Sequence, residues 1–266
     1  MTPCFAFLCS DPALLDIAIT PFKDALRVAD GAPSGWGVAY YQAGQPLLHK
    51  QPRAAAAPFD IVDATHDLKT PLFLGQIREA WDLPNRNENT PPFRFRRWTF
   101  TLSGTPPHMD AVRDEVNEAI PKFIQRNIRG RTNAEIIFHL LLAFLNDAGK
   151  LDDPRTEGAP IARALTSTLS YVDRLVGDAW PYCCAITNGH TLAATHRDHP
   201  MHIKKSQPYI HVGVGPDDKP LSYPHLHALA ILGSTPPEGD GWERVDGGTV
   251  LTTNLDLDIN LSTPAS

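Results

Sequence analysis

The order of its periodic segments is the feature that most constrains what this chain can fold into. Short apolar runs typical of β-strands fill the first hundred residues and return after residue 178, whereas the segment between them has helical periodicity. Such an order indicates an α+β protein in which sheets pack together with helices outside. Strands are expected at 4–9, 38–41, 46–49, 72–77, 97–102, 183–187, 191–195, 210–214, 227–232 and 249–252.

The helices are expected mainly in the middle of the chain. Residues 110–128 are amphipathic but interrupted by Pro121, and residues 132–145 carry an apolar face that begins at a capping box formed by Thr132 and Glu135. A further helix is expected over about 159–176, and a shorter one near 22–28. The first strand lies so close to the N-terminus that the chain is expected to begin inside its own core.

Size and charge limit the classes of function. The chain has 266 residues, 42% of them hydrophobic, and a formal net charge of −6. These values favour one domain over 1–266 and give no electrostatic footprint for nucleic acid or an anionic membrane. No apolar run approaches the roughly 20 residues that span a bilayer, and no basic residue precedes the first apolar run, so we expect a cytoplasmic protein.

The spacing of the cysteines and histidines predicts neither a disulfide framework nor a standard zinc site. The four cysteines are too few and too unevenly placed for a disulfide framework, and Cys183 and Cys184 should face opposite ways on a strand, one buried and one semi-exposed. Seven of the eleven histidines lie between His190 and His227, with the run from His196 to His202 expected in a loop. Their spacing matches no standard zinc site, so no metal is assigned.

The stretch from Leu74 to Gly104 carries most of the candidate chemistry. It holds an arginine, Arg78, at the end of an apolar run, then a proline-bounded loop, then a second apolar run that ends in Ser103-Gly104. These are groups that an enzyme needs to bind a carboxylate and to stabilise an oxyanion.

Six short motifs, in this order along most of the chain, carry a family resemblance. They are Met1-Thr2-Pro3, Ser34-Gly35-Trp36-Gly37-Val38-Ala39-Tyr40-Tyr41, Gln76-Ile77-Arg78-Glu79-Ala80-Trp81, Asn89-Thr90-Pro91-Pro92-Phe93, Phe100-Thr101-Leu102-Ser103-Gly104 and Thr132-Asn133-Ala134-Glu135. Together they resemble the class II glutamine amidotransferases, which have an N-terminal nucleophile, and especially the compact stand-alone branch that includes the ergothioneine-pathway γ-glutamyl hydrolases. The resemblance implies a four-layer α/β/β/α sandwich of two packed antiparallel sheets. It also implies hydrolysis of a glutamine or γ-glutamyl amide without a cofactor.

The resemblance places Thr2 at the nucleophile, where the family has a cysteine. Because the α-amine of that residue serves as the base, Thr2 can act only after Met1 is removed. Cys4 lies on the same strand face and is a second candidate, although a core thiol is the favoured interpretation. In the implied oxyanion hole Ser103 replaces an asparagine, and Gly104 keeps its backbone N–H.

The implied substrate-binding positions are Arg78, Asn89, Thr90, Asn133 and Trp36. Arg78 would bind a substrate carboxylate, or it is a structural arginine paired with Glu79 or another acid. Asn133 replaces an aspartate that binds the substrate α-ammonium, and so gives up the charge. Asn89 and Thr90 either line the pocket or shape the loop, and for Trp36 a packed turn residue is the favoured alternative.

Two functions remain open at this point. An enzyme would hydrolyse an amide with Thr2 as nucleophile. A pseudoenzyme would keep the fold as a ligand-binding or partner subunit, and the changes at Thr2, Ser103 and Asn133 favour it slightly. The expected partners are a small amide or amino-acid-like molecule and a synthase or other partner protein, with neither nucleic acid nor membrane among them.

Overall fold

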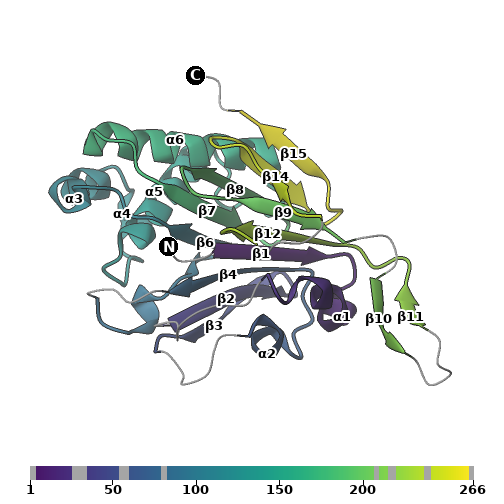
Figure 1. Ribbon diagram of the computed structural model, residues 1–266. Coiled ribbons are helices and arrows are strands. Elements are labelled where there is room, and N and C mark those ends of the chain that lie inside the picture. Colours follow the sequence, from purple (N-terminus) through teal and green to yellow (C-terminus); the bar gives the residue numbers. More distant parts are fainter. Residues whose placement is uncertain are drawn as a thin grey trace.

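Two antiparallel sheets are stacked face to face, and helices cover both outer faces (Figure 1). The computed structural model describes residues 4–25, 35–53, 60–78, 83–206, 210–214, 220–236 and 241–263. Helices α5 (Asn133–Asp147) and α6 (Gly158–Val176) cover one sheet, and the short helices α1 (Leu15–Ile19) and α2 (Ile61–Thr65) cover the other. The expected α+β class and four-layer arrangement are confirmed.

The first sheet has seven strands in the order β13-β9-β12-β1-β4-β2-β3, all paired antiparallel. Its strands are β1 (Cys4–Cys9), β2 (Gly35–Gln42), β3 (Gln45–Gln51), β4 (Leu72–Arg78), β9 (His202–Lys205), β12 (Ala228–Gly233) and β13 (Glu243–Arg244). The first strand of the chain therefore lies at the centre of this sheet, as the sequence predicts.

The second sheet has six strands in the order β15-β14-β8-β7-β6-β5, again all antiparallel. Its strands are β5 (Phe93–Phe95), β6 (Trp98–Ser103), β7 (Tyr182–Thr187), β8 (Thr191–Arg197), β14 (Val250–Asn254) and β15 (Ile259–Ser262). Two further strands, β10 (Ile210–Val214) and β11 (Pro220–Tyr223), pair with each other.

The helical middle follows its sequence signals closely. Pro121 separates α3 (Met109–Glu118) from α4 (Lys122–Gln125), because proline has no N–H to continue the first helix. The Thr132 hydroxyl caps α5 by accepting a hydrogen bond from the Glu135 N–H at 3.1 Å. The Glu135 carboxylate does not complete the expected capping box; it accepts the N–H groups of Arg129 and Gly130 instead, at 2.9 and 2.7 Å.

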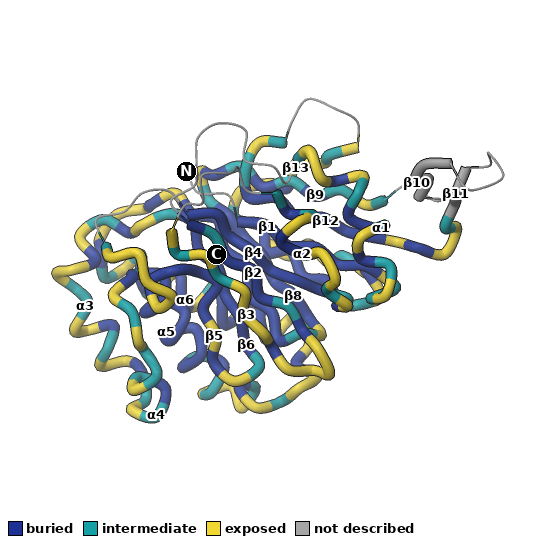
Figure 2. Tube along the Cα trace, turned by 90° about the horizontal axis from the view of Figure 1, so that it is seen from below, coloured by how far each residue is buried: buried dark blue, intermediate teal, exposed yellow. Residues whose placement is uncertain are grey.

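Three apolar layers hold the four structural layers together, and Figure 2 shows the strands buried beneath exposed loops and helix faces. Strand β1 shows how alternation builds two of them. Phe5, Phe7 and Cys9 pack toward α1 and α2, whereas the intervening Cys4, Ala6 and Leu8 pack between the sheets. Because both faces of this strand are covered, its sequence reads as a continuous apolar run.

Two local expectations are wrong, and a third lies partly outside the described residues. Of the helix predicted near 22–28, residues 26–28 are outside the described chain and residues 23–25 form a turn after α1 and the 3-10 residues Thr20–Phe22. The segment from His196 to His202 is not all loop, because His196 belongs to β8 and His202 begins β9. Cys184 and Cys183 do face opposite layers, but both are buried.

Among the described residues, no helix is both long enough and apolar enough to cross a membrane. The expected single domain over 1–266 stays a prediction, as does the cytoplasmic location.

Candidate functional site

The residues singled out by the sequence lie mainly where several strands begin or end at one edge of the sandwich. Cys4, at the start of β1, is paired with Gln76 on β4 and with Gly233 on β12. On the facing sheet Ser103, at the end of β6, is paired with Cys183 on β7. Thr2, the implied nucleophile, lies outside the described residues, as does Met1.

Cys4 is a core thiol, as the favoured interpretation had it. It is only 3% exposed, and its Sγ lies 3.2 Å from the Sγ of Cys183 across the space between the sheets. A Cβ at Gly233 would stand 2.5 Å from one sulfur and 2.6 Å from the other, so glycine is needed there. The environment disfavours a thiolate, since the hydrogen bond with Cys4 and burial both raise the pKa of Cys183.

Ser103 lies against a histidine that the sequence did not connect with it. The Ser103 Oγ is 3.4 Å from His199 Nε2, and both residues are buried. His199 Nδ1 lies 3.2 Å from the Pro200 carbonyl oxygen; because a carbonyl only accepts, Nδ1 donates and Nε2 is left to accept from Ser103. Burial lowers the pKa of His199, which keeps the imidazole neutral near pH 7.

Gly104 follows Ser103 with a backbone conformation that suits glycine. Its φ is +108°, and a Cβ there would collide with the carbonyl oxygen of Pro181. Gly104 lies directly after β6, next to Ser103. Its backbone N–H is the group that could donate a hydrogen bond to an oxyanion.

Arg78 ends β4 with its side chain buried, at 0% exposed. Its Nη2 donates to Asn85 Oδ1 at 2.8 Å and to the Leu83 carbonyl oxygen at 3.2 Å. The guanidinium therefore holds the start of the loop that leads to Asn89, and it does not reach out to solvent. Burial lowers the pKa of Arg78, which still leaves an arginine charged at neutral pH.

Asn89 and Thr90 make contacts that shape this loop. The Asn89 side chain donates to the Pro84 carbonyl oxygen at 3.0 Å and accepts the Arg131 N–H at 3.0 Å, which ties the loop to the entrance of α5. The Thr90 hydroxyl donates to the Arg86 carbonyl oxygen at 2.9 Å. Both side chains are buried.

Asn133 sits in the first turn of α5 and is bound by a cation. Its Oδ1 accepts a hydrogen bond from Nη2 of Arg113, on α3, at 2.8 Å. The same Nη2 donates to the Arg131 carbonyl oxygen at 3.1 Å. A position that the resemblance assigns to a negatively charged acid is thus neutral, and a positive charge lies directly against it.

Trp36, on β2, is half-buried and packs edge-to-face on His49 of β3, with ring centroids 4.8 Å apart. Its neighbour Gly37 allows the Pro91 backbone to approach, since a Cβ there would collide with the Pro91 carbonyl oxygen. A Cβ at Gly35 would instead stand 2.7 Å from the Gln51 carbonyl oxygen, so close backbone packing explains both glycines around Trp36.

The histidine-rich segment does not form a metal centre in the described part of the chain, where no group of three or more His, Cys, Asp or Glu residues could hold an ion. His196 Nε2 instead lies 2.9 Å from the Val245 carbonyl oxygen, and His202 Nδ1 lies 3.0 Å from that of Ser234.

The fold therefore brings Ser103, Gly104 and the start of β1 to one edge of the sandwich. Contacts within the protein hold the other candidates in the loop before β5 and at the start of α5; these are Arg78, Asn89, Thr90 and Asn133. Sequence reasoning missed Arg113, and it considered His199 only as part of the histidine-rich segment and not as a neighbour of Ser103. In the sequence, the only sign of either role was a charged or titratable side chain for which no partner was evident.

Comparison with known proteins gives one family match. The model of the family described as "Glutamine amidotransferases class-II" matches residues 1–256. No protein with a curated description matches the chain.

Several solved structures share the fold. A glutamine aminotransferase class-II domain protein from Silicibacter pomeroyi is 21% identical, with a TM-score of 0.58 over 99% of this chain and 100% of that one. A predicted glutamine amidotransferase from Pseudomonas aeruginosa is 17% identical, with a TM-score of 0.61 over 97% and 95%. Glutamine phosphoribosylpyrophosphate amidotransferase from B. subtilis is 12% identical, with a TM-score of 0.58 over 98% of this chain and 49% of that one.

Proposed function

The chain belongs to the class II glutamine amidotransferase family, and from that premise we propose that it is a pseudoenzyme toward glutamine. In this proposal it keeps the fold as a cytoplasmic protein that binds a small amide or amino-acid-like ligand, alone or as the partner subunit of a synthase. The ligand carries no ammonium group near Asn133.

The Arg113–Asn133 contact carries this proposal. Glutamine presents an α-ammonium, and the family resemblance places that group at Asn133. Here the amide oxygen of Asn133 already accepts a hydrogen bond from a guanidinium at 2.8 Å, so a second cation would meet repulsion rather than an acid. Ser103 in place of asparagine also shortens the side chain that would support an oxyanion.

An ammonia-release assay with L-glutamine tests the proposal, with the Thr2→Ala variant measured in parallel. We expect no release above the protein-free background from either protein. Release by the wild type that disappears in Thr2→Ala would overturn the proposal, because it would make Thr2 the working nucleophile. Release that is unchanged in Thr2→Ala indicates a contaminating glutaminase, and repeat purification removes it.

A second candidate is an amide hydrolase with Thr2 as nucleophile. The backbone N–H of Gly104 and the neutral His199 beside Ser103 favour it, since both are groups that acyl-transfer chemistry uses. Intact mass of the untagged protein decides whether this candidate survives. Loss of Met1 would give Thr2 a free α-amine and justify a panel of γ-glutamyl amides, whereas retained Met1 leaves Thr2 without its base.

A further inference from the structure

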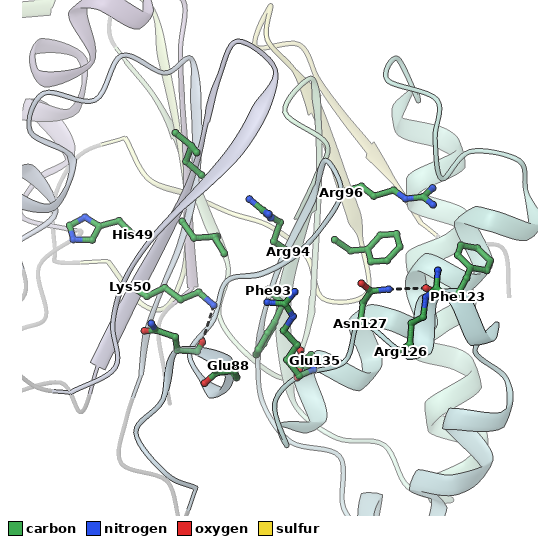
Figure 3. A pocket seen from close by; sticks show the side chains of 15 residues that line it. His49, Lys50, Glu88, Phe93, Arg94, Arg96, Phe123, Arg126, Asn127 and Glu135 are labelled. Atoms are coloured by element: carbon green, nitrogen blue, oxygen red, sulfur yellow. Dashed lines mark hydrogen bonds between the residues drawn. The ribbon is translucent and has the colours of Figure 1, made fainter.

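A cavity of about 900 Å³ lies apart from the site residues that the family resemblance implies. It lies between β3, β5, the segment around α4, and the loop that carries Asn87 and Glu88 (Figure 3). None of Trp36, Arg78, Asn89, Thr90, Ser103, Gly104 or Asn133 lines it. We call it the β3–β5 groove. Its volume falls within the range of small-molecule sites.

The charge of the groove is opposite to that of the whole chain. Lys50, Arg94, Arg96, Arg126 and Arg129 line it, against two carboxylates, Glu88 and Glu135. The lining thus carries a net charge of +3, in a chain whose formal net charge is −6. A concave surface of one sign concentrates ligands of the other sign.

Strand geometry accounts for the cations of β5. Phe93 and Phe95 point into the apolar layer beneath α5, so Arg94 between them points the other way, and it is exposed. Its Nη1 donates to the Pro46 carbonyl oxygen at 3.0 Å, which fixes the side chain across the groove toward β3. In Figure 3 Lys50 extends from β3 on one side, Arg126 and Phe123 lie on the other, and Arg94 and Glu135 stand between them.

Two of the arginines remain available to a ligand. Arg96 is already bound to Asp152 and packs over the rings of Phe95 and Phe123. Arg126 and Arg129 are exposed, and within the described chain neither guanidinium has a hydrogen bond or an ion pair. Their planar forks suit the oxygens of a phosphate group.

The acids of the groove do not neutralise it. The Glu135 carboxylate accepts hydrogen bonds from the N–H groups of Arg129 and Gly130. Burial raises the pKa of Glu135, which favours the uncharged form of this side chain. Lys50 donates to the Asn87 carbonyl oxygen at 3.1 Å and lies over the ring of Phe93. Leu47 and Leu48, both exposed, add apolar surface to the rim.

We propose that the β3–β5 groove binds a phosphorylated small molecule, whose phosphate monoester is attracted by the cationic lining that includes Lys50, Arg126 and Arg129 and whose apolar or aromatic part lies against Leu47, Leu48 and Phe123. A phosphate monoester carries a charge near −2 at neutral pH, which matches the groove better than the single charge of a carboxylate. The cations are confined to one cavity, and this fits a small molecule rather than a polynucleotide, which needs an extended positive surface.

Isothermal titration calorimetry with adenosine 5′-monophosphate as the probe tests the proposal. Adenosine serves as the uncharged matched probe, and Arg163→Gln, at an exposed position of α6 away from the groove, serves as the matched variant. We expect saturable binding of the monophosphate by the wild type and by Arg163→Gln, and none of adenosine. The double variant Arg126→Gln, Arg129→Gln should bind about tenfold or more weakly, with an unchanged melting temperature.

The pH profile of the same titration reports on Lys50. Burial lowers the pKa of Lys50 to about 8, against the opposing effects of Glu135 on α5 and Glu88 before Asn89, and with Arg94 on β5 acting in the same direction as burial. The phosphate is already a dianion above pH 7, so affinity should fall as the pH rises through about 8, and Lys50→Gln should remove that fall.

Absence of saturable binding by the wild type would overturn the proposal, and so would a double variant that binds as tightly as Arg163→Gln. Equal affinity for inorganic phosphate and the monophosphate would contradict the role given to the apolar rim. None of these outcomes depends on glutamine hydrolysis, because no residue of the candidate amidotransferase site lines the groove.

Discussion

At the residue scale, the proposed discrimination against glutamine rests on one side-chain contact. Asn133 is held by Arg113 at 2.8 Å, so restoring an acid there requires removing the guanidinium as well. We expect the double variant Asn133→Asp, Arg113→Gln to bind L-glutamine. With a millimolar dissociation constant, about 10 mM glutamine would stabilise the protein by roughly 1.4 kcal/mol and raise its melting temperature by about 2–4 °C.

Thermal unfolding measured with and without L-glutamine checks this prediction. The wild type and Arg113→Gln alone should show no shift, because neither carries an acid at position 133. A shift in the wild type equal to that of the double variant would contradict the charge argument. The same series with a dicarboxylate that lacks an ammonium group shows whether a shift depends on the ammonium.

The motifs could predict which residues belong to this site, but not which side chains contact them. Ser103, Gly104 and Asn133 were found because each stands at a fixed place in a short motif. The contact of Ser103 with His199 spans 96 residues, and that of Asn133 with Arg113 spans 20. Both depend on how strands and helices pack, which no local spacing encodes. The same limit hid the Glu135 contacts, because a capping box predicts a bond to its own N-cap residue.

At the element scale, a tyrosine hydroxyl joins the two sheets. Tyr41 lies on β2, and its hydroxyl is 2.8 Å from the Arg97 carbonyl oxygen, 2.9 Å from Thr99 Oγ1 and 3.0 Å from the Thr187 carbonyl oxygen, all on the facing sheet or its turn. Burial raises the pKa of Tyr41, so the hydroxyl stays protonated and able to donate. Tyr41→Phe should lower the free energy of unfolding by about 1–3 kcal/mol, because buried acceptors lose their donor.

Urea denaturation followed by circular dichroism measures this change. The neighbouring Tyr40→Phe is the matched control, since Tyr40 is half-buried on the opposite face of β2 and shows no hydrogen bond within the described chain. It should change the free energy of unfolding by less than about 0.5 kcal/mol. Equal losses in the two variants would show that the hydroxyl does not couple the sheets.

The elements that the sequence predicted share a clear physical signature. β1 is a continuous apolar run and β4 begins with one, because both faces of each strand are covered. α6 shows a helical apolar period beneath a polar face, and α5 is apolar over most of its surface. β9 was missed because only Ile203 of its residues is buried, which leaves no alternation to detect. α1 was not predicted at 15–19, because its buried residues Leu15, Ala18 and Ile19 are too few to give a clear helical period.

At the scale of the whole molecule, the three apolar layers enclose every cysteine. Cys9 lies in the layer under α1 and α2, Cys4 and Cys183 lie between the sheets, and Cys184 lies in the layer under α5 and α6. Burial raises the pKa of Cys9 to about 12. We expect Ellman's reagent to find no fast-reacting thiol in the native protein and four in denaturing guanidinium chloride. One rapidly labelled native thiol, located by peptide mass, would show that a layer opens without unfolding.

The same layers make stability depend on pH through two buried histidines. His139 lies among aromatic rings on α5 and His199 between the sheets, and burial lowers the pKa of both below the usual value near 6.5. Between the folded-state and unfolded-state pKa values the unfolded chain binds more protons, so stability rises with pH there. The free energy of unfolding should therefore fall as the pH drops below about 6.5, by up to about 1.4 kcal/mol per pH unit for each histidine, and the loss should stop below the folded-state pKa.

Chemical denaturation at a series of pH values from neutral downward measures this slope. His139→Gln and His199→Gln should each reduce it, whereas His227→Gln, at an exposed position, should leave it unchanged. Glu135 acts in the opposite direction, because burial raises its pKa and stability tied to its protonated form is lost as the pH rises. Comparing each variant with the wild type at the same pH cancels that contribution. Slopes identical in all four proteins would mean that neither buried histidine resists protonation, and that the layers around them admit water.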